Sequence, residues 1–306
     1  MKKYDSIVVL GATASGKTKL AVAIAGQING EILSIDSRMV YKQMDIGTGK
    51  DLNEYVYQNK PISYHLMNIC EPYEKYHIYQ FQQDFKLALK QIQASHKFPI
   101  LCGGSGLYLE AVIKDFTYTS LPTNAGLRTE LEAFSLSQLQ EHFIQLPPHS
   151  FKEVADLGSK KRAIRALEIL YYLQQNPSFT LPPSNPLNPF IIGLNPNLEQ
   201  RRKQIILRLH QRIEQGLIEE VSHLLAQGIS QEKLISLGLE YKFVTQFLAG
   251  EFSKETMINL LGIAIQQFAK RQMTYFRKME KSGLTIHWAN SPEMALNLLK
   301  QAELIP

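Results

Sequence analysis

The segment 11–18, with the sequence GATASGKT, constrains the fold more than any other part of the chain. It follows a short apolar run, residues 7–10, of the kind that forms a strand buried on both faces. A helical pattern over 19–27 comes directly after it. A glycine-rich turn between a buried strand and a helix presents several backbone N–H groups to an anion. This context therefore predicts a phosphate-binding loop.

The residue types in this loop each have a chemical role. Lys17 would supply a positive charge to terminal phosphates, and the hydroxyl of Thr18 would ligate magnesium. We therefore predict Thr18 as the metal ligand and Mg²⁺ as the cofactor. The predicted phosphate-binding residues are Gly11, Thr13, Ala14, Ser15, Gly16, Lys17 and Thr18.

Two further strand-like runs predict the fold class. Residues 32–35 and 99–102 are apolar and resemble buried strands, the second running into the glycine-rich turn 103–106 and another helix. Repeated strand–turn–helix units form parallel sheets with crossover helices. We predict an α/β fold: a P-loop NTPase-like parallel sheet with flanking helices, plus an all-α insert domain.

The insert is predicted from a change of pattern after residue 116. Only helical segments are found from 121 to 175, and five prolines between 177 and 189 indicate a stiff, extended linker. The chain then returns to the sheet at 190–194. The predicted domains are a catalytic core, 1–119 with 187–306, and a helical insert, 120–186.

Two long helices and a last strand are predicted to complete the core. The apolar stripe of the first runs over 205–225 and that of the second over 265–279. The final strand is expected at 285–288.

Charge and cysteine content bear on partners and compartment. The 306 residues carry a net charge of +5, but the stretches 199–215 and 268–281 alone carry +3 and +4. Such concentration suggests a polyanionic partner, although basic runs of this kind more often form a solvated helix face. The chain has two cysteines and no CxxC pair, and it lacks a long apolar run near the N-terminus. We therefore expect a cytoplasmic protein without membrane association.

Polar residues at the predicted strand ends are candidates for chemistry. Asp36 could be a general base or a magnesium partner through water, or it could make a turn or cap. Ser105 could donate a hydrogen bond to substrate or cap the helix that follows. No carboxylate ends the strand at 99–102, which argues against an ATP-hydrolysing enzyme. Residues 44–50, a second small-residue loop ending in Lys50, are either a phosphate site or a surface loop.

Motifs along most of the chain resemble those of the tRNA dimethylallyltransferases (tRNA isopentenyltransferases, the IPP transferase family). They occur in family order: GATASGKT at 11–18, SIDS at 34–37, VY at 40–41, MDIGT at 44–48, GGSGLY at 103–108, RALE at 165–168 and AKRQ at 269–272. The family implies transfer of a dimethylallyl group from dimethylallyl pyrophosphate to N6 of the adenosine just 3′ of the anticodon (tRNA position 37), with release of pyrophosphate.

The resemblance also implies residue roles. Asp36 would be the base that takes the N6 proton, and Ser105 a catalytic hydroxyl. Lys17, Thr18 with Mg²⁺, and Arg208 would stabilise the departing pyrophosphate. The insert would grip the anticodon stem-loop of a tRNA bound by a monomer. The predicted tRNA-binding residues are Asp36, Ser37, Arg38, Met39, Lys161, Arg162, Arg165, Lys270, Arg271 and Arg277.

The sequence departs from the family at three places, and other functions stay open. Met39 stands where glutamine is common, Gln204 replaces an arginine one helical turn before Arg208, and two residues are added between Gly238 and Tyr241. The alternatives are a small-molecule P-loop kinase, an adenylate isopentenyltransferase that uses a free nucleotide, and a tRNA-binding protein without catalysis.

Overall fold

The computed structural model describes residues 3–306, which divide into two compact units. The first unit comprises the chain up to Asp115 together with Pro186–Pro306, and the second is Phe116–Asn185. The sequence prediction for the insert is 120–186. Within the described residues, no helix is both long and apolar enough to cross a membrane.

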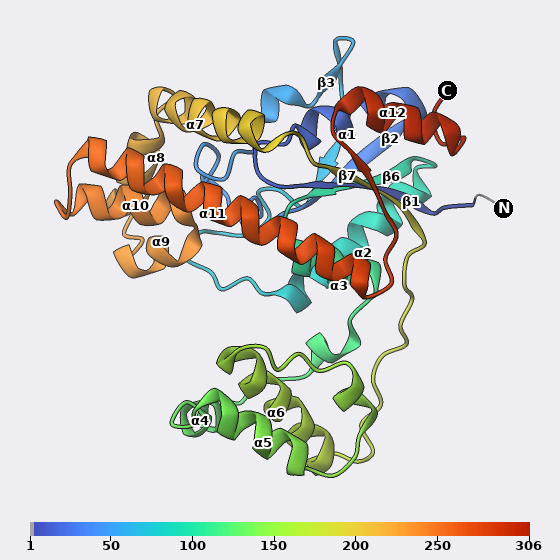
Figure 1. The fold of residues 1–306 in the computed structure, drawn as a ribbon, viewed down its shortest axis with the longest axis vertical. Helices are drawn as coiled ribbons and strands as arrows, with labels where there is room; N and C mark the ends of the chain where they lie inside the picture. Colours follow the sequence, from blue (N-terminus) through green and yellow to red (C-terminus); the bar gives the residue numbers. More distant parts are fainter. Residues whose placement is uncertain (1–2) are drawn as a thin grey trace. The chain divides into compact units, whose positions relative to one another are not determined.

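The first unit is built on a six-stranded sheet in which every strand pair is parallel (Figure 1). This confirms the predicted α/β class with a parallel sheet. In spatial order the strands are β5 (Tyr64–His65), β2 (Gly30–Ile35), β6 (Phe98–Gly103), β1 (Ser6–Gly11), β7 (Pro189–Leu194) and β8 (Ile286–Ala289). A small antiparallel hairpin, β3 (Val56–Tyr57) with β4 (Lys60–Pro61), lies outside this sheet.

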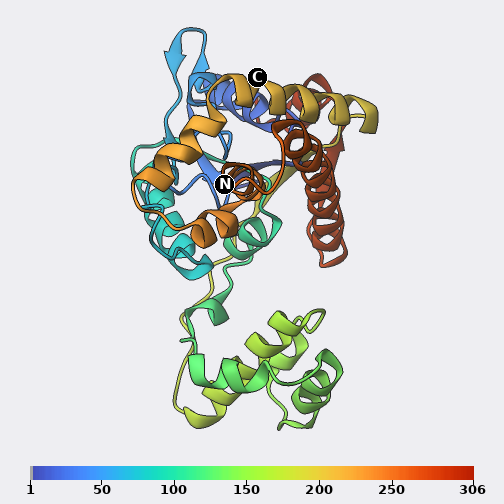
Figure 2. The same ribbon diagram turned by 90° about the vertical axis from the view of Figure 1, so that its left-hand side faces the viewer.

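Helices cover both faces of the sheet (Figures 1 and 2). Successive residues of β1 enter different cores: Ile7 and Val9 pack with α1 and α12, whereas Val8 and Leu10 pack with the remaining helices of the unit. The helices are α1 (Lys17–Ile28), α2 (Ile78–Ala94), α3 (Gly106–Ile113), α7 (Leu198–Glu214), α8 (Leu217–Ala226), α9 (Gln231–Leu237), α10 (Leu239–Leu248), α11 (Lys254–Lys281) and α12 (Pro292–Gln301).

The prediction of one long helix through 205–225 is wrong. Gly216 adopts φ = 103°, a left-handed conformation that only glycine takes up without strain, and it separates α7 from α8. The apolar stripe continues past the break because Leu217, Val221 and Leu224 of α8 are buried in the same core as Ile205 of α7. Hydrophobic periodicity alone therefore did not reveal the bend.

The second unit is helical and has its own core. It contains α4 (Ala125–Leu131), α5 (Leu136–Gln145) and α6 (Lys160–Gln175), with no strand among its residues. Leu139, Phe143, Ala163, Leu167 and Leu170 form the centre of this core. Burial of its own apolar side chains makes the unit a separate structural element.

A buried carboxylate ties the second unit together. Glu168 of α6, whose side chain is 1% exposed, accepts hydrogen bonds from Arg128 Nε (3.0 Å), Arg128 Nη2 (2.8 Å) and Arg165. Arg165 also donates to the carbonyl oxygens of Leu121 (2.7 Å) and Pro122 (2.9 Å). Burial opposes ionisation of Glu168, but the hydrogen bonds from Arg128 and Arg165 outweigh it and hold its pKa below the usual 4.5.

We predict that Glu168→Gln loosens this unit, because the amide cannot accept both guanidinium groups. The free energy of local unfolding should fall by about 2–3 kcal/mol, measured by hydrogen–deuterium exchange over residues 116–185 of the full chain. The exposed Glu130→Gln of α4 is the control and should change little. Because the folded pKa is depressed, acid should weaken the wild-type unit only below about pH 4.5, and the variant should lack this sensitivity. Equal exchange in wild type and Glu168→Gln would contradict the assignment.

Candidate active site

A pocket of about 590 Å³ lies at the carboxyl ends of the central strands. The chain leaves β1 into the phosphate loop, β2 into Asp36 and β6 into Ser105, so parallel pairing brings these segments to one edge of the sheet. The four predicted catalytic residues all line the pocket: Lys17, Asp36, Ser105 and Arg208. Residues as far apart in the sequence as Lys17 and Arg208 are therefore brought together.

The segment 11–18 forms the strand–loop–helix geometry expected of a phosphate-binding loop. Ala14 and Gly16 have positive φ angles of 59° and 86°, which turn the backbone tightly before α1 begins at Lys17. The first turn of α1 has no acidic residue and no side-chain cap, so its N–H groups keep their partial positive charge. Ser15 Oγ is buried without a hydrogen-bond partner. Such a set of unused donors suits an anion.

Lys17 is a half-buried cation that lines the pocket and has no carboxylate partner. Among the described residues it makes no ion pair within 4.0 Å, unlike Lys50 and Arg208. Burial lowers the pKa of Lys17 below 10.5, and the nearby charges of Arg208 and Arg212 add to this, while Cys102 and Asp36 oppose it. An anion placed beside Lys17 would favour its charged ammonium form and be bound by it.

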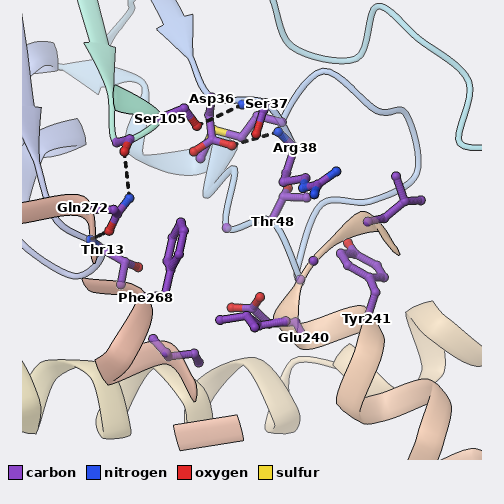
Figure 3. Close-up of a pocket in the computed structure, with 18 of the residues that line it drawn as sticks. Thr13, Asp36, Ser37, Arg38, Thr48, Ser105, Glu240, Tyr241, Phe268 and Gln272 are labelled. Atoms are coloured by element: carbon purple, nitrogen blue, oxygen red, sulfur yellow. Dashed lines mark hydrogen bonds between the residues drawn. The ribbon is translucent and has the colours of Figure 1, made fainter. Parts of the chain in front are cut away.

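Asp36 and Ser105 lie close together at the pocket wall (Figure 3). Asp36 Oδ1 accepts the N–H of Arg38 at 2.9 Å, so the aspartate makes the turn as well as facing the pocket. Ser105 does not cap α3 with its side chain; its Oγ instead accepts the N–H of Ser37 at 3.2 Å. The hydroxyl proton of Ser105 is thereby left to donate elsewhere.

The far side of the pocket carries arginines and apolar groups. Arg208 of α7 donates to Asp51 Oδ2 at 2.5 Å, and Arg212 one turn later pairs with Glu240 at 3.3 Å. Phe268 projects into the space between Gln272 and Glu240 (Figure 3). Further hydrocarbon lining comes from Leu107, Tyr108, Ile235, Leu239, Ile265 and Tyr275. The pocket thus joins a cationic end to an apolar wall.

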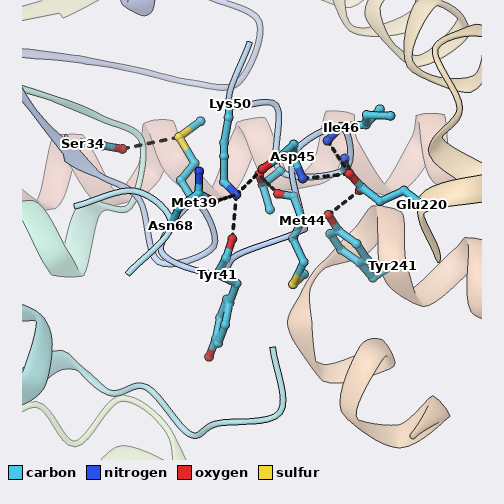
Figure 4. Close-up of polar contacts among 12 residues, drawn as sticks. Ser34, Met39, Tyr41, Met44, Asp45, Ile46, Lys50, Asn68, Glu220 and Tyr241 are labelled. Carbon is cyan, nitrogen blue, oxygen red and sulfur yellow. Dashed lines mark hydrogen bonds and ion pairs between the residues drawn. The ribbon is translucent and has the colours of Figure 1, made fainter. Parts of the chain in front are cut away.

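The loop 44–50 is neither a phosphate site nor an ordinary surface loop. Lys50 is fully buried, and its Nζ donates to Tyr41 O (2.6 Å), Asp45 Oδ1 (2.6 Å) and Asn68 Oδ1 (2.5 Å) (Figure 4). The N–H groups of Asp45, Ile46 and Gly47, which could have cradled a phosphate, donate to the carboxylate of Glu220. The carboxylate of Glu220 therefore occupies the position where this loop could have bound a phosphate.

Comparison with known proteins agrees with this geometry. A sequence profile of the family described as IPP transferase matches residues 39–279. The chain is 46% identical to tRNA dimethylallyltransferase 1 of Parabacteroides distasonis, over 95% of this chain and 94% of that protein. The chain belongs to the IPP transferase family. It is also 44% identical to tRNA dimethylallyltransferase 2 of Bacteroides fragilis, over 98% of both chains.

Solved structures of similar proteins share the fold of this IPP transferase. The crystal structure of the full-length tRNA isopentenylpyrophosphate transferase of Bacillus halodurans has a TM-score of 0.69 at 28% identity, covering 97% of this chain and 96% of that one. A eukaryotic dimethylallyltransferase acting on tRNA has a TM-score of 0.72 at 20% identity, covering 98% and 77%.

The predicted tRNA-binding residues fall in three places in this IPP transferase. Asp36, Ser37, Arg38, Met39 and Arg271 line the pocket. Lys270 and Arg277 are exposed on α11. Burial lowers the pKa of Arg201 on α7, and the positive charges of Arg202 and Arg277 lower it further. Lys161 and Arg162 lie in the first turn of α6 in the second unit, and Arg162 pairs with Asp156 at 3.3 Å. Arg165 is bonded within its own unit, so its contact with tRNA stays a prediction.

Gln272 has a structural role at the site that the sequence pattern did not reveal. Its Oε1 accepts the N–H of Thr13 in the phosphate loop, and its Nε2 donates to Gly104 O, each at 2.9 Å (Figure 3). One buried amide thus fixes the loop after β1 to the turn after β6. The available signal was a glutamine inside the buried stripe of α11, between Ala269 and Met273.

We predict that Gln272→Leu frees the phosphate loop, because it leaves the half-buried Thr13 N–H and the buried Gly104 carbonyl without partners. The free energy of unfolding should fall by about 1–3 kcal/mol, and residues 11–18 should exchange amide hydrogens faster with deuterium. The matched control is Gln267→Leu, an exposed position on the same helix that should leave both measurements near wild type. Unchanged exchange in the Gln272 variant would show that the loop holds its shape alone.

Proposed function

We propose that this enzyme transfers a dimethylallyl group from dimethylallyl pyrophosphate to N6 of the adenosine immediately 3′ of the anticodon, releasing pyrophosphate. The observation that carries the proposal is the pocket itself. It combines a phosphate-binding loop, a carboxylate and an apolar wall within one cavity. A pyrophosphate ester of a short hydrocarbon needs the first and third of these features, and deprotonation of an amine needs the second.

The pyrophosphate fits the cationic end of the pocket. The N–H groups at the start of α1 and the unpaired Lys17 would bind its oxygens, and Arg208 would face them from α7. Negative charge grows on the leaving group as its C–O bond breaks. Donors already fixed in position stabilise that charge without reorganisation.

Magnesium fits this site only as an ion shared with the substrate. The described residues hold no group of three or more His, Cys, Asp or Glu side chains that could bind a metal by themselves. Thr18 offers a hydroxyl and Asp36 a carboxylate in the same pocket, and Mg²⁺ commonly completes its shell with phosphate oxygens and water. When bound, the ion would offset the charge of the pyrophosphate.

The hydrocarbon would lie against Phe268 and Leu107. Both residues line the pocket and are exposed, 39% and 48%, so a bound apolar group would cover part of their surface. Covering them also keeps water away from the allylic carbon while its bond to the leaving oxygen weakens. This favours attack by the nucleophile over hydrolysis.

Asp36 is suited to accept the proton that the reaction releases. N6 of the adenosine attacks the allylic carbon, the bond from that carbon to the pyrophosphate oxygen breaks, and the N6 proton passes to the carboxylate. Oδ1 already accepts the Arg38 N–H, which fixes the orientation of the side chain. Ser105, whose own proton is uncommitted, can donate to the departing oxygen.

The acceptor is a macromolecule in this proposal. Arg201 and Arg277, on different helices, lie near one another on the core, and Lys161 and Arg162 give the insert a basic helix start. Phosphates of an anticodon stem-loop would contact such side chains without specifying sequence. The pocket residues Ser37, Arg38, Met39 and Arg271 would surround the target base.

The direct test is transfer without ATP. The purified enzyme, dimethylallyl pyrophosphate, Mg²⁺ and an anticodon stem-loop should yield RNA heavier by one dimethylallyl group, detected by mass spectrometry. Asp36→Asn keeps an oxygen for the Arg38 N–H but cannot take the proton, so its single-turnover rate should fall at least ~10²-fold with unchanged RNA affinity. A near-normal rate would reduce Asp36 to a turn residue, and equally fast modification of AMP would point to a free-nucleotide enzyme.

Salt dependence tests the RNA surface. The logarithm of RNA affinity should fall linearly with the logarithm of salt concentration, by about 0.7–0.9 per neutralised phosphate. Arg277→Ala should lower that slope by about one and weaken all tRNAs alike, measured by filter binding. Lys300→Ala, an exposed lysine on α12 at the opposite face of the sheet, should leave the slope unchanged. Identical slopes for wild type and Arg277→Ala would remove this residue from the surface.

A further inference from the structure

Arg212 is a second arginine at the pocket, one helical turn beyond Arg208 on α7. Its side chain is 12% exposed and pairs with Glu240 in the first turn of α10, whose side chain is 17% exposed. Burial raises the pKa of Glu240 and lowers that of Arg212, because removal from water disfavours the charged form of each group. Each charge is therefore stabilised by its partner. Such a pair contributes little net stability compared with apolar side chains of similar size.

The surroundings of Arg212 are those of the phosphate loop. A small cavity joins Arg208 and Arg212 to Thr13 and Ala14. On another side the guanidinium lies against Gly49, where a Cβ would collide with its Nη2, and Gly49 also has φ = 68°. The loop 44–50 therefore leaves room for this one cationic group beside the pocket. Only Nη1 is hydrogen-bonded to Glu240, and the planar guanidinium has five N–H donors.

Two departures from the family pattern bear on the role of Arg212. Gln204, in place of an arginine one turn before Arg208, is exposed and does not line the pocket. Leu239 and Glu240 are the two residues added between Gly238 and Tyr241. The added segment thus supplies the carboxylate that holds Arg212, so α7 presents its two pocket arginines at 208 and 212.

We propose that Arg212 is a catalytic residue that binds the leaving pyrophosphate together with Lys17 and Arg208. The assignment rests on the proposed function, because it requires that pyrophosphate occupy the phosphate loop. A desolvated guanidinium interacts strongly with phosphate oxygens, and its fork geometry allows two parallel hydrogen bonds. As the C–O bond breaks, the charge gained by the leaving group is nearest these three cations.

The experiment measures binding of inorganic pyrophosphate with Mg²⁺ to the full-length protein by calorimetry. Arg212→Met alone would leave Glu240 buried and unpaired, so the informative variant is Arg212→Met/Glu240→Gln, which removes both charges. It should keep the wild-type thermal midpoint within a few degrees and bind pyrophosphate about 10- to 100-fold more weakly. Glu240→Gln retains Arg212 and an acceptor for its Nη1–H, so its affinity should stay within about threefold of wild type.

Lys203→Met controls for the loss of one positive charge, since Lys203 is exposed on the same helix and does not line the pocket. Its pyrophosphate affinity should match wild type. In turnover, kcat/KM for dimethylallyl pyrophosphate should fall in the double variant while KM for the RNA stays constant. If the double variant binds pyrophosphate as wild type does, Arg212 is only a structural tie and the assignment fails alone. If wild type binds none, the proposed function fails with it.

Discussion

The parallel pairing of β1 with β6, and of β6 with β2, is the constraint on which the site depends. Ile7 and Ile32 both align with Ile100, so the three strands end level with one another. The phosphate loop, Asp36 and Ser105 each begin where one of these strands stops. A register shift would move one of them along the sheet edge and reverse the faces of its strand, burying the wrong side chains. The apolar cores on the two faces of the sheet therefore fix the relative positions of the phosphate loop, Asp36 and Ser105.

Charge is distributed unevenly in this framework. Lys50, Arg208, Arg212 and Glu168 are each held by a defined partner, which offsets the cost of removing a charge from water. Lys17 is half-buried at the pocket and has no carboxylate partner within 4.0 Å among the described residues. It can therefore bind an anionic substrate without first giving up an ion pair. Arg208 and Arg212 line the same pocket, but each is also tied to a carboxylate.

The sequence predicted the elements whose signal is local, and failed where contacts are distant. The strands, the phosphate loop and the helical insert follow from apolar runs, glycines and prolines within a few residues. The role of Lys50 was not predicted, because it depends on two residues distant in the sequence. Asn68 accepts a hydrogen bond from Lys50, and Glu220 of α8 accepts the backbone N–H groups of the loop. Gln272 joins segments that are far apart in the chain. A glutamine within the buried stripe of α11 indicates a buried polar contact but does not identify its partners. The sequence shows Glu240 and Arg212, but not that they pair.

The place where the helical unit interrupts the chain has a consequence for biosynthesis. β1 pairs with β6 on one side and with β7 on the other, and the whole of Phe116–Asn185 lies between β6 and β7 in the sequence. While the ribosome makes those residues, β1 is an open edge strand with unpaired backbone groups, a state prone to aggregation. The interrupting unit is helical and has its own core, and helical units fold faster than sheets. It can therefore fold before β7 is synthesised, so that during this interval the unpaired edge of β1 is the main exposed strand edge of the nascent chain.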